Sequence, residues 1–160
     1  MTSILSMDVS SVSTGWSVII NGKPKDYGLI KPPDGYDLSQ KLLWFRNDFR
    51  KLLKLYQPSH VVVEETYMRN VKTLKTLVQF VGIINVECLD LLDLRPSFVS
   101  PNTVRSEFGL KTKEDVFKAV QSKYKAKFKH LTFDEGNDIT DSVLQGIFWW
   151  NMIDKEKKDG

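Results

Sequence analysis

Short apolar stretches in the first third of the chain predict β-strands. Residues 3–8 and 15–20 form two such stretches, and the Asn21-Gly22 pair between the second stretch and residues 26–30 is a strong hairpin signal. We therefore expect three antiparallel strands that follow one another in the sheet. Another strand is expected over residues 60–66, because its three consecutive valines are typical of a strand buried on both faces. Residues 97–99 are a candidate for a short fifth strand.

Apolar residues that recur every three or four positions predict helices in the remaining chain. The first should begin after Asp37, which can cap it, with Gln40 three residues later. In all, five helices are expected, over residues 38–56, 71–92, 101–108, 113 to about 125, and 137 or 138 to about 153. This order indicates an α/β fold with a mixed sheet, antiparallel at first and then parallel, flanked by helices on both faces. We expect one domain over residues 1–154 and a solvated tail over residues 155–160.

Composition excludes several classes of protein. The 160 residues are 41% hydrophobic and 27% charged, a mixture typical of globular domains rather than disordered or fibrous chains. The single cysteine, Cys88, excludes an internal disulfide and suits a reducing compartment, so we expect a cytoplasmic protein. No apolar run reaches the ~18 residues that a membrane span needs. A net charge of +3 is a mild indication of a polyanionic partner.

Four acidic residues stand where the pattern calls for apolar ones. Asp8 ends the first strand, Glu64 follows the three valines, and Asp138 and Asp141 share one face of the last helix. Carboxylates held together repel one another and lose hydration, so they take up protons or recruit a cation. The absence of nearby cysteine or paired histidine favours hard cations, Mg²⁺ or Mn²⁺ as its substitute. Two such ions ~4 Å apart can hold an attacking water and a leaving oxygen on either side of a phosphate.

Each acid also has an ordinary structural interpretation. Asp138 could cap the last helix, and Asp141 could be a first-turn acid favoured by the helix dipole. Asp8 could form a turn, and Glu64 could begin a solvated loop. The joint pattern favours the metal site, because a mixed sheet can bring all four positions together.

Three segments resemble, in order, the motifs of the RuvC-type Holliday junction resolvases. ILSMDVSSVSTGWSVI resembles their first hairpin, although Val9-Ser10 replaces the usual Pro-Gly. HVVVEETYM resembles the strand that ends in a glutamate, and GNDITDSVLQG resembles the acidic opening of the last helix. The resemblance covers nearly the whole chain. It implies an RNase H-like fold, a homodimer, and Mg²⁺-dependent cutting of four-way DNA junctions.

The resemblance also implies roles for individual residues. The acids that it makes catalytic and metal-binding, with two Mg²⁺ ions per active site, are Asp8, Glu64, Asp138 and Asp141. Glu64 rather than Glu65 matches, because Glu65 would point to the other side of its strand. The residues that it assigns to DNA are an aromatic near the unpaired bases and basic groups around the cut strand, namely Tyr67, Arg69, Arg105, Lys111 and Lys113. Ordinary surface positions are the alternative for these five.

The expected dimer face is the helix over residues 71–92. Phe80 and Ile83 give it more apolar surface than one core stripe requires, although burial within the monomer is the alternative. A two-fold dimer places one active site on each of two opposed strands of a junction. The resemblance thus implies paired symmetric nicking, and the two-metal reaction expected with it would leave 5′-phosphate and 3′-hydroxyl ends.

Other functions stay open at this point. A nuclease of the same fold could act on flaps, Y-forks or RNA:DNA hybrids, and the altered first turn leaves room for such relaxed selectivity. A non-catalytic junction-binding protein is a second alternative. A phosphate-binding fold of the sugar-kinase and actin type is a third, but the chain is too short for its second lobe.

Overall fold

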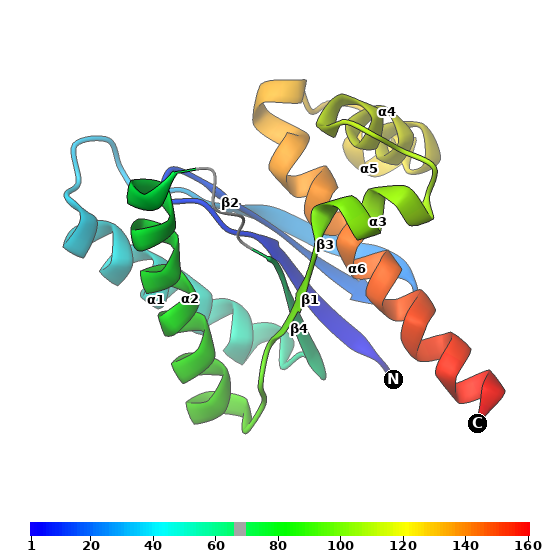
Figure 1. Cartoon of the computed structure of the whole chain (residues 1–160), viewed down its shortest axis with the longest axis horizontal. Coiled ribbons are helices and arrows are strands. Elements are labelled where there is room, and N and C mark those ends of the chain that lie inside the picture. Colours follow the sequence, from blue (N-terminus) through cyan, green and yellow to red (C-terminus); the bar gives the residue numbers. More distant parts are fainter. Residues whose placement is uncertain (66–69) are drawn as a thin grey trace.

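The computed structural model describes residues 1–65 and 70–160 and has a five-stranded mixed sheet with helices on both faces (Figure 1). The strand order is β3-β2-β1-β4-β5, in which β1, β2 and β3 are antiparallel neighbours and β1, β4 and β5 run parallel. The strands are β1 (Ser3–Asp8), β2 (Thr14–Ile20), β3 (Lys23–Ile30), β4 (His60–Glu64) and β5 (Ser97–Val99). The predicted mixed sheet is confirmed, and β4 ends at residue 64 rather than 66.

Six helices are present in the described part of the chain. They are α1 (Leu38–Tyr56), α2 (Val71–Leu92), α3 (Pro101–Glu107), α4 (Lys113–Lys123), α5 (Lys125–Phe128) and α6 (Phe133–Asp159). The capping box predicted for α1 is present, with Asp37 and Gln40 bonding to each other's backbone N–H groups at 2.9 Å. Among the described residues, no helix has the length and apolar character needed to cross a membrane.

The sheet separates two apolar cores. Helices α1 and α2 cover one face, and α6 lies across the other together with α3 and α4 (Figure 1). Along β1, Leu5 and Met7 belong to the core under α1 and α2, whereas Ile4 belongs to the core under α6. Since side chains alternate along a strand, Asp8 therefore lies on the α6 side.

The same alternation orients β4. Val61 and Val63 belong to the core under α1 and α2, whereas Val62 belongs to the core under α6. The strand is thus buried on both faces, as its three valines predict. Glu64 follows the parity of Val62, so it lies on the α6 side of the sheet, like Asp8.

Helix α6 begins earlier than predicted. It starts at Phe133 rather than at residue 137 or 138, because the Thr132 side chain accepts a hydrogen bond from the backbone N–H of Glu135 and caps the helix. The helix continues through Gly136, where a Cβ would lie only 2.9 Å from the Cβ of Leu131, so this position has no room for a side chain. Asp138 consequently lies in the second turn, and its interpretation as an N-cap is wrong.

Helix α6 also ends later than predicted. It continues to Asp159 rather than ending near residue 153, and Lys158 pairs with Asp154 one turn earlier at 2.8 Å. Such pairs support an exposed helix. Residues 155–159 are therefore helical, and residues 155–160 are exposed.

Helix α4 is shorter than predicted. It ends at Lys123 instead of continuing to about residue 125, and the short helix α5 follows after Tyr124. The change of direction brings Phe128 into the core, where its side chain is fully buried. Burial of this one aromatic ring explains why the lysine-rich segment does not extend α4.

Candidate metal centre

Carboxylates from three elements converge at one end of the sheet. Asp8 ends β1 and Glu64 ends β4, and these strands are adjacent and parallel, with Met7 beside Val63. Asp141 reaches the same place from α6. One carboxylate oxygen from each of Asp8, Glu64 and Asp141 lies within 4.8 Å of the other two. Residues far apart in the sequence thus form a single anionic cluster.

The close approach of α6 to β2 depends on Gly15. This residue lies directly opposite Asp8 in the β1–β2 pair. A Cβ at Gly15 would lie 2.3 Å from the carbonyl carbon of Asp138 and 2.6 Å from the backbone nitrogen of Ile139. Atoms cannot approach so closely, so only glycine lets α6 bring its two acids beside Asp8.

Lys113, the first residue of α4, provides the central cation of the cluster. Its Nζ atom lies 2.6 Å from Asp138 Oδ1, 3.2 Å from Asp8 Oδ2 and 3.4 Å from Asp141 Oδ2. Thr112 caps α4 and forms a reciprocal capping box with Asp115, which fixes the start of the helix. One ammonium group therefore holds together three of the four predicted acids.

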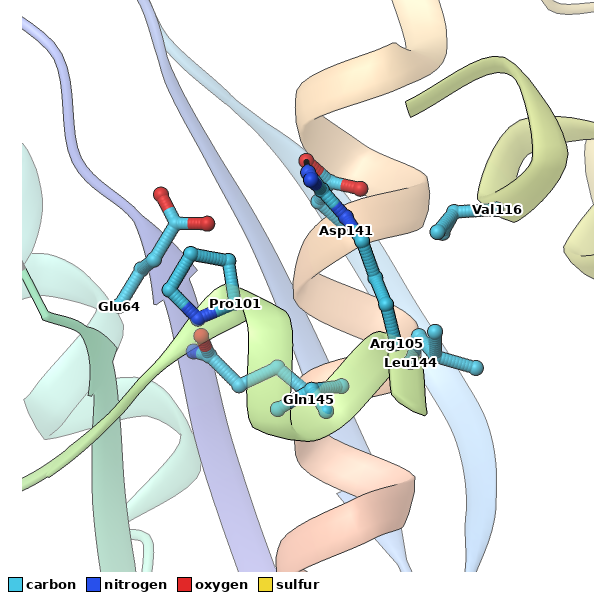
Figure 2. Close-up of a pocket in the computed structure, with 8 residues that line it drawn as sticks. Glu64, Pro101, Arg105, Val116, Asp141, Leu144 and Gln145 are labelled. Atoms are coloured by element: carbon cyan, nitrogen blue, oxygen red, sulfur yellow. Dashed lines mark ion pairs between the residues drawn. The ribbon is translucent and has the colours of Figure 1, made fainter. Parts of the chain in front are cut away.

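Arg105 from α3 forms the other side of the site. Its Nη2 atom lies 3.6 Å from Asp141 Oδ2, and Figure 2 shows the two side chains meeting at the pocket that Glu64 and Gln145 also line. Asp141 Oδ2 is buried and accepts no hydrogen bond within the described parts of the chain. Its neighbours are the two cationic groups at ion-pair distance.

The protonation of the cluster follows from burial and from crowding of like charges. Burial raises the pKa of Glu64 well above its ordinary value, and the charge of Asp8 raises it further. Burial and Asp8 also raise the pKa of Asp141 to about 7, against the opposing charge of Lys113. Burial likewise raises the pKa of Asp138. Burial alone would lower the pKa of Lys113, but the surrounding carboxylates raise it, so the ammonium stays charged.

The donor set suits a hard divalent cation. Four carboxylates face two cationic side chains, so full ionisation leaves an excess of negative charge that one divalent ion would neutralise. Asp141 Oδ2 is a buried oxygen without a hydrogen-bond donor, as a vacant ligand atom would be. Oxygen ligands alone are typical of Mg²⁺ and Mn²⁺ sites. The residues present therefore fit such an ion.

The residues expected to contact DNA are distributed differently. Arg105 and Lys113 both lie in the acidic cluster, where they pair with carboxylates. Lys111 lines an open hollow together with Arg105, beside the cluster. Tyr67 and Arg69 lie outside the described residues.

The surface of α2 differs from the prediction in one respect. Phe80 is not surplus apolar surface, because it is 1% exposed and packs edge-on against Phe45 of α1. Ile83 is half-buried and packs against the same core, so it is not surplus surface either. A different set of α2 side chains is apolar and exposed, namely Val71, Val78, Val86 and Leu89. Their spacing places them along one side of the helix, and we call these four residues the α2 stripe.

Gln145 is a buried polar residue near the site that the sequence analysis did not identify. Gln145 lies on α6 one turn after Asp141, is 4% exposed, and donates hydrogen bonds from its amide to β1 and β4. The only signal in the sequence is a glutamine between the apolar residues Leu144 and Ile147. A glutamine in this pattern is equally typical of the polar edge of an amphipathic helix, so the sequence does not indicate that it is buried.

Comparison with known protein families shows that a family model matches most of the chain. The family model described as "Crossover junction endodeoxyribonuclease RuvC" matches residues 4–125. This range includes Asp8, Glu64 and Lys113 and ends before α6. The family match therefore does not extend to Asp138 and Asp141, which the structure places beside Asp8.

Relatives and solved structures agree with the family match. The crossover junction endodeoxyribonuclease RuvC of Protochlamydia amoebophila is 38% identical over 88 residues, which are 52% of this chain and 52% of that protein, so the match spans about half of its length. The corresponding protein of Dictyoglomus thermophilum is 25% identical over 154 residues, 88% of this chain and 90% of that protein. The structure "T. thermophilus RuvC in complex with Holliday junction substrate" superposes with a TM-score of 0.76 at 14% identity, covering 95% of this chain and 96% of that one. This similarity confirms the expected RNase H-like fold.

Proposed function

Because this chain belongs to the family of RuvC crossover junction endodeoxyribonucleases, we propose that it is a Mg²⁺-dependent endonuclease that resolves four-way DNA junctions. It nicks two opposed strands symmetrically and leaves 5′-phosphate and 3′-hydroxyl ends. The proposed place of action is the cytoplasm, where branched DNA is available to it. Two Mg²⁺ ions per active site serve the reaction, and Mn²⁺ can replace them.

The convergence of three carboxylates, of which Asp8 and Asp141 are buried and Glu64 is half-buried, carries this proposal. Asp8, Glu64 and Asp141 present oxygens within 4.8 Å of one another, and Asp138 extends the set from one turn earlier on α6. A fold alone does not specify a reaction, whereas convergent carboxylates are the donor set that a hard cation prefers, and they support the proposed metal site. That site, in a protein of this family, supports phosphodiester hydrolysis.

The chain's own residues have distinct parts in the reaction. Asp8, Glu64, Asp138 and Asp141 would hold the cations. When bound, the cations supply the positive charge that activates a water and stabilises the leaving oxygen. The water oxygen forms a bond to phosphorus, the bond from phosphorus to the 3′-oxygen breaks, and that oxygen takes up a proton. Arg105 and Lys113 have the charge and position to stabilise the crowded phosphate during this exchange.

DNA contacts extend the site on one side. The hollow that Arg105 and Lys111 line also contains Asn102 and Ser106, so a strand passing through it meets two cations and two neutral hydrogen-bonding groups. Phosphate oxygens accept hydrogen bonds from all of these groups. Tyr67 and Arg69 follow Glu64 in the chain, and we retain them as proposed contacts to the junction.

A homodimer would place two active sites on the junction. The α2 stripe exposes four apolar side chains along one side of the helix that faces away from the core. A second copy related by two-fold symmetry would bury the same stripe on both molecules. We propose this face as the dimer interface.

The experiment compares DNA substrates of equal length and sequence. Purified protein with Mg²⁺ is given a four-way junction, a flap, an RNA:DNA hybrid and a linear duplex. The proposal predicts paired nicks in the junction and little cutting of the other three. Equal cutting of the junction and the flap would favour a general branched-DNA nuclease, and binding without cutting would favour a junction-binding protein.

A further inference from the structure

Gln145 makes an unusual set of contacts for a core residue. Its Nε2 atom lies 2.9 Å from Ser6 Oγ, 3.1 Å from the carbonyl oxygen of Met7 and 3.2 Å from the carbonyl oxygen of Val62. Two of these partners can only accept hydrogen bonds, so the amide nitrogen must face them. A single side-chain group therefore connects α6 to both β1 and β4.

These contacts coincide with the residues that carry the acids. Met7 directly precedes Asp8, and Val62 stands two residues before Glu64 on the same face of β4. On α6, Asp141 stands one turn before Gln145, on the same side of the helix. The three elements joined by the amide are thus the three that supply the carboxylate cluster.

The surroundings of Gln145 make this connection specific. Gly146 lets the helix lie directly against the sheet, since a Cβ there would lie 2.5 Å from Ile19 Cγ1 and 3.1 Å from Ser6 Cβ. Packing by neighbours such as Val143 and Ile147 has no preferred direction along the strands. Hydrogen bonds to fixed carbonyl oxygens are directional, so they define the position of α6 along β1 and β4.

We propose that Gln145 is a positioning residue for the metal centre, which fixes the distance between the Asp141 carboxylate on α6 and the acids at the ends of β1 and β4. This proposal rests on the proposed metal-dependent function. Mg²⁺ requires near-ideal octahedral geometry, so a small shift of one ligand-bearing element weakens binding. Gln145 contributes no ligand atom and acts through the elements it joins.

The test measures the affinity of the full chain for Mn²⁺ alone, by calorimetry, in wild type and two glutamine variants. Gln145→Leu should bind Mn²⁺ about tenfold more weakly, the effect typical of groups that orient metal ligands. Gln121→Leu is the matched control, because the Gln121 amide also donates to two backbone carbonyls, of Phe128 and Leu131, but joins no acid-bearing strand. The Mn²⁺ affinity of Gln121→Leu should equal that of the wild type, even if its melting temperature falls as far as that of Gln145→Leu.

Equal Mn²⁺ affinity in wild type and Gln145→Leu would overturn the positioning role. A wild-type chain that binds no Mn²⁺ would instead overturn the proposed metal dependence itself, so the two failures are distinguishable. If Gln145→Leu does not fold, Ser6→Ala decides, since it removes one of the three contacts and leaves the amide in place. A measurable loss of Mn²⁺ affinity in Ser6→Ala, smaller than about tenfold, supports the proposal. An unchanged affinity overturns it.

Discussion

At the scale of single residues, Lys113 is the main cationic partner of the carboxylate cluster. Its ammonium contacts Asp8, Asp138 and Asp141, and so offsets the repulsion that would otherwise open the site. A cation bound to the same oxygens competes with Lys113 for them. We expect metal binding to displace the Lys113 side chain, which would make its ammonium available for the phosphate.

Replacement of Asp8 by asparagine tests the assignment of the central ligand. Asp8→Asn keeps the shape of the side chain but removes its charge. Groups that only orient metal ligands cost up to about 100-fold when mutated, so loss of a ligand itself should reduce nicking by more than that. Junction binding, measured by gel shift in EDTA, should persist. Glu65→Gln is the control, because Glu65 is exposed and follows Glu64 outside the cluster. Full activity of Asp8→Asn would refute the assignment.

The raised pKa of Asp141 predicts a pH-dependent metal affinity. Its carboxyl holds a proton up to a pKa of about 7, because it is buried and lies beside Asp8. A cation must displace that proton, so Mn²⁺ affinity should increase as the pH rises from 5.5 to 8. Without metal, the free energy of unfolding should instead decrease as the pH rises. The pKa of Asp141 is higher in the folded than in the unfolded chain, so its stabilising contribution is complete at low pH and is lost as the pH rises through about 7.

Calorimetric titrations at several pH values measure this dependence. The same titrations on Asp141→Asn, which has no proton to lose at this position, should give a flatter profile. A wild-type Mn²⁺ affinity that is constant over this range would be incompatible with a protonated Asp141.

At the scale of elements, the contact between β2 and α6 positions the site. Gly15→Ala would place a Cβ 2.3 Å from the backbone of Asp138, so the helix must move away from the sheet. Overpacking of this kind costs about 1–3 kcal/mol, and urea unfolding should show a loss of that size, together with weaker Mn²⁺ binding. Gly82→Ala is the control, because nothing lies within 4 Å of a Cβ there and alanine favours a helix. Equal stability of Gly15→Ala and wild type would disprove the close approach.

Sequence patterns predicted the elements well where local chemistry decides them. The capping pair Asp37 and Gln40 gives the start of α1, and three valines give a strand buried on both faces. The predicted start of α6 was wrong because Thr132 caps the helix before Gly136, a position where close packing against Leu131 leaves no room for a side chain. Local propensity gives no information about such contacts.

The candidate site was predictable to a similar extent. The four acids stand out because each interrupts an apolar pattern, and the resemblance to a known family gave their order. The contacts of Lys113 and Gln145 were not predictable, because they join residues more than one hundred positions apart, such as Lys113 with Asp8 and Gln145 with Ser6. Only the folded chain brings these pairs together.

At the scale of the whole molecule, the α2 stripe determines the expected assembly. Val78→Glu places a charge in the stripe, which a two-fold dimer would bury on both copies, and burying an unpaired charge costs several kcal/mol. Sedimentation should show a dimer for the wild type and a monomer for this variant. Leu55→Glu is the control, since Leu55 is equally apolar and 72% exposed but lies on α1. A monomeric wild type would exclude the proposed interface.

The most direct test of the central claim is the anomalous scattering of crystals soaked in Mn²⁺. The account predicts metal peaks within bonding distance of the carboxylates of Asp8, Glu64 and Asp141, with the Lys113 ammonium displaced from them. Crystals whose carboxylates still hold Lys113, and whose metal peaks lie only elsewhere, would contradict it.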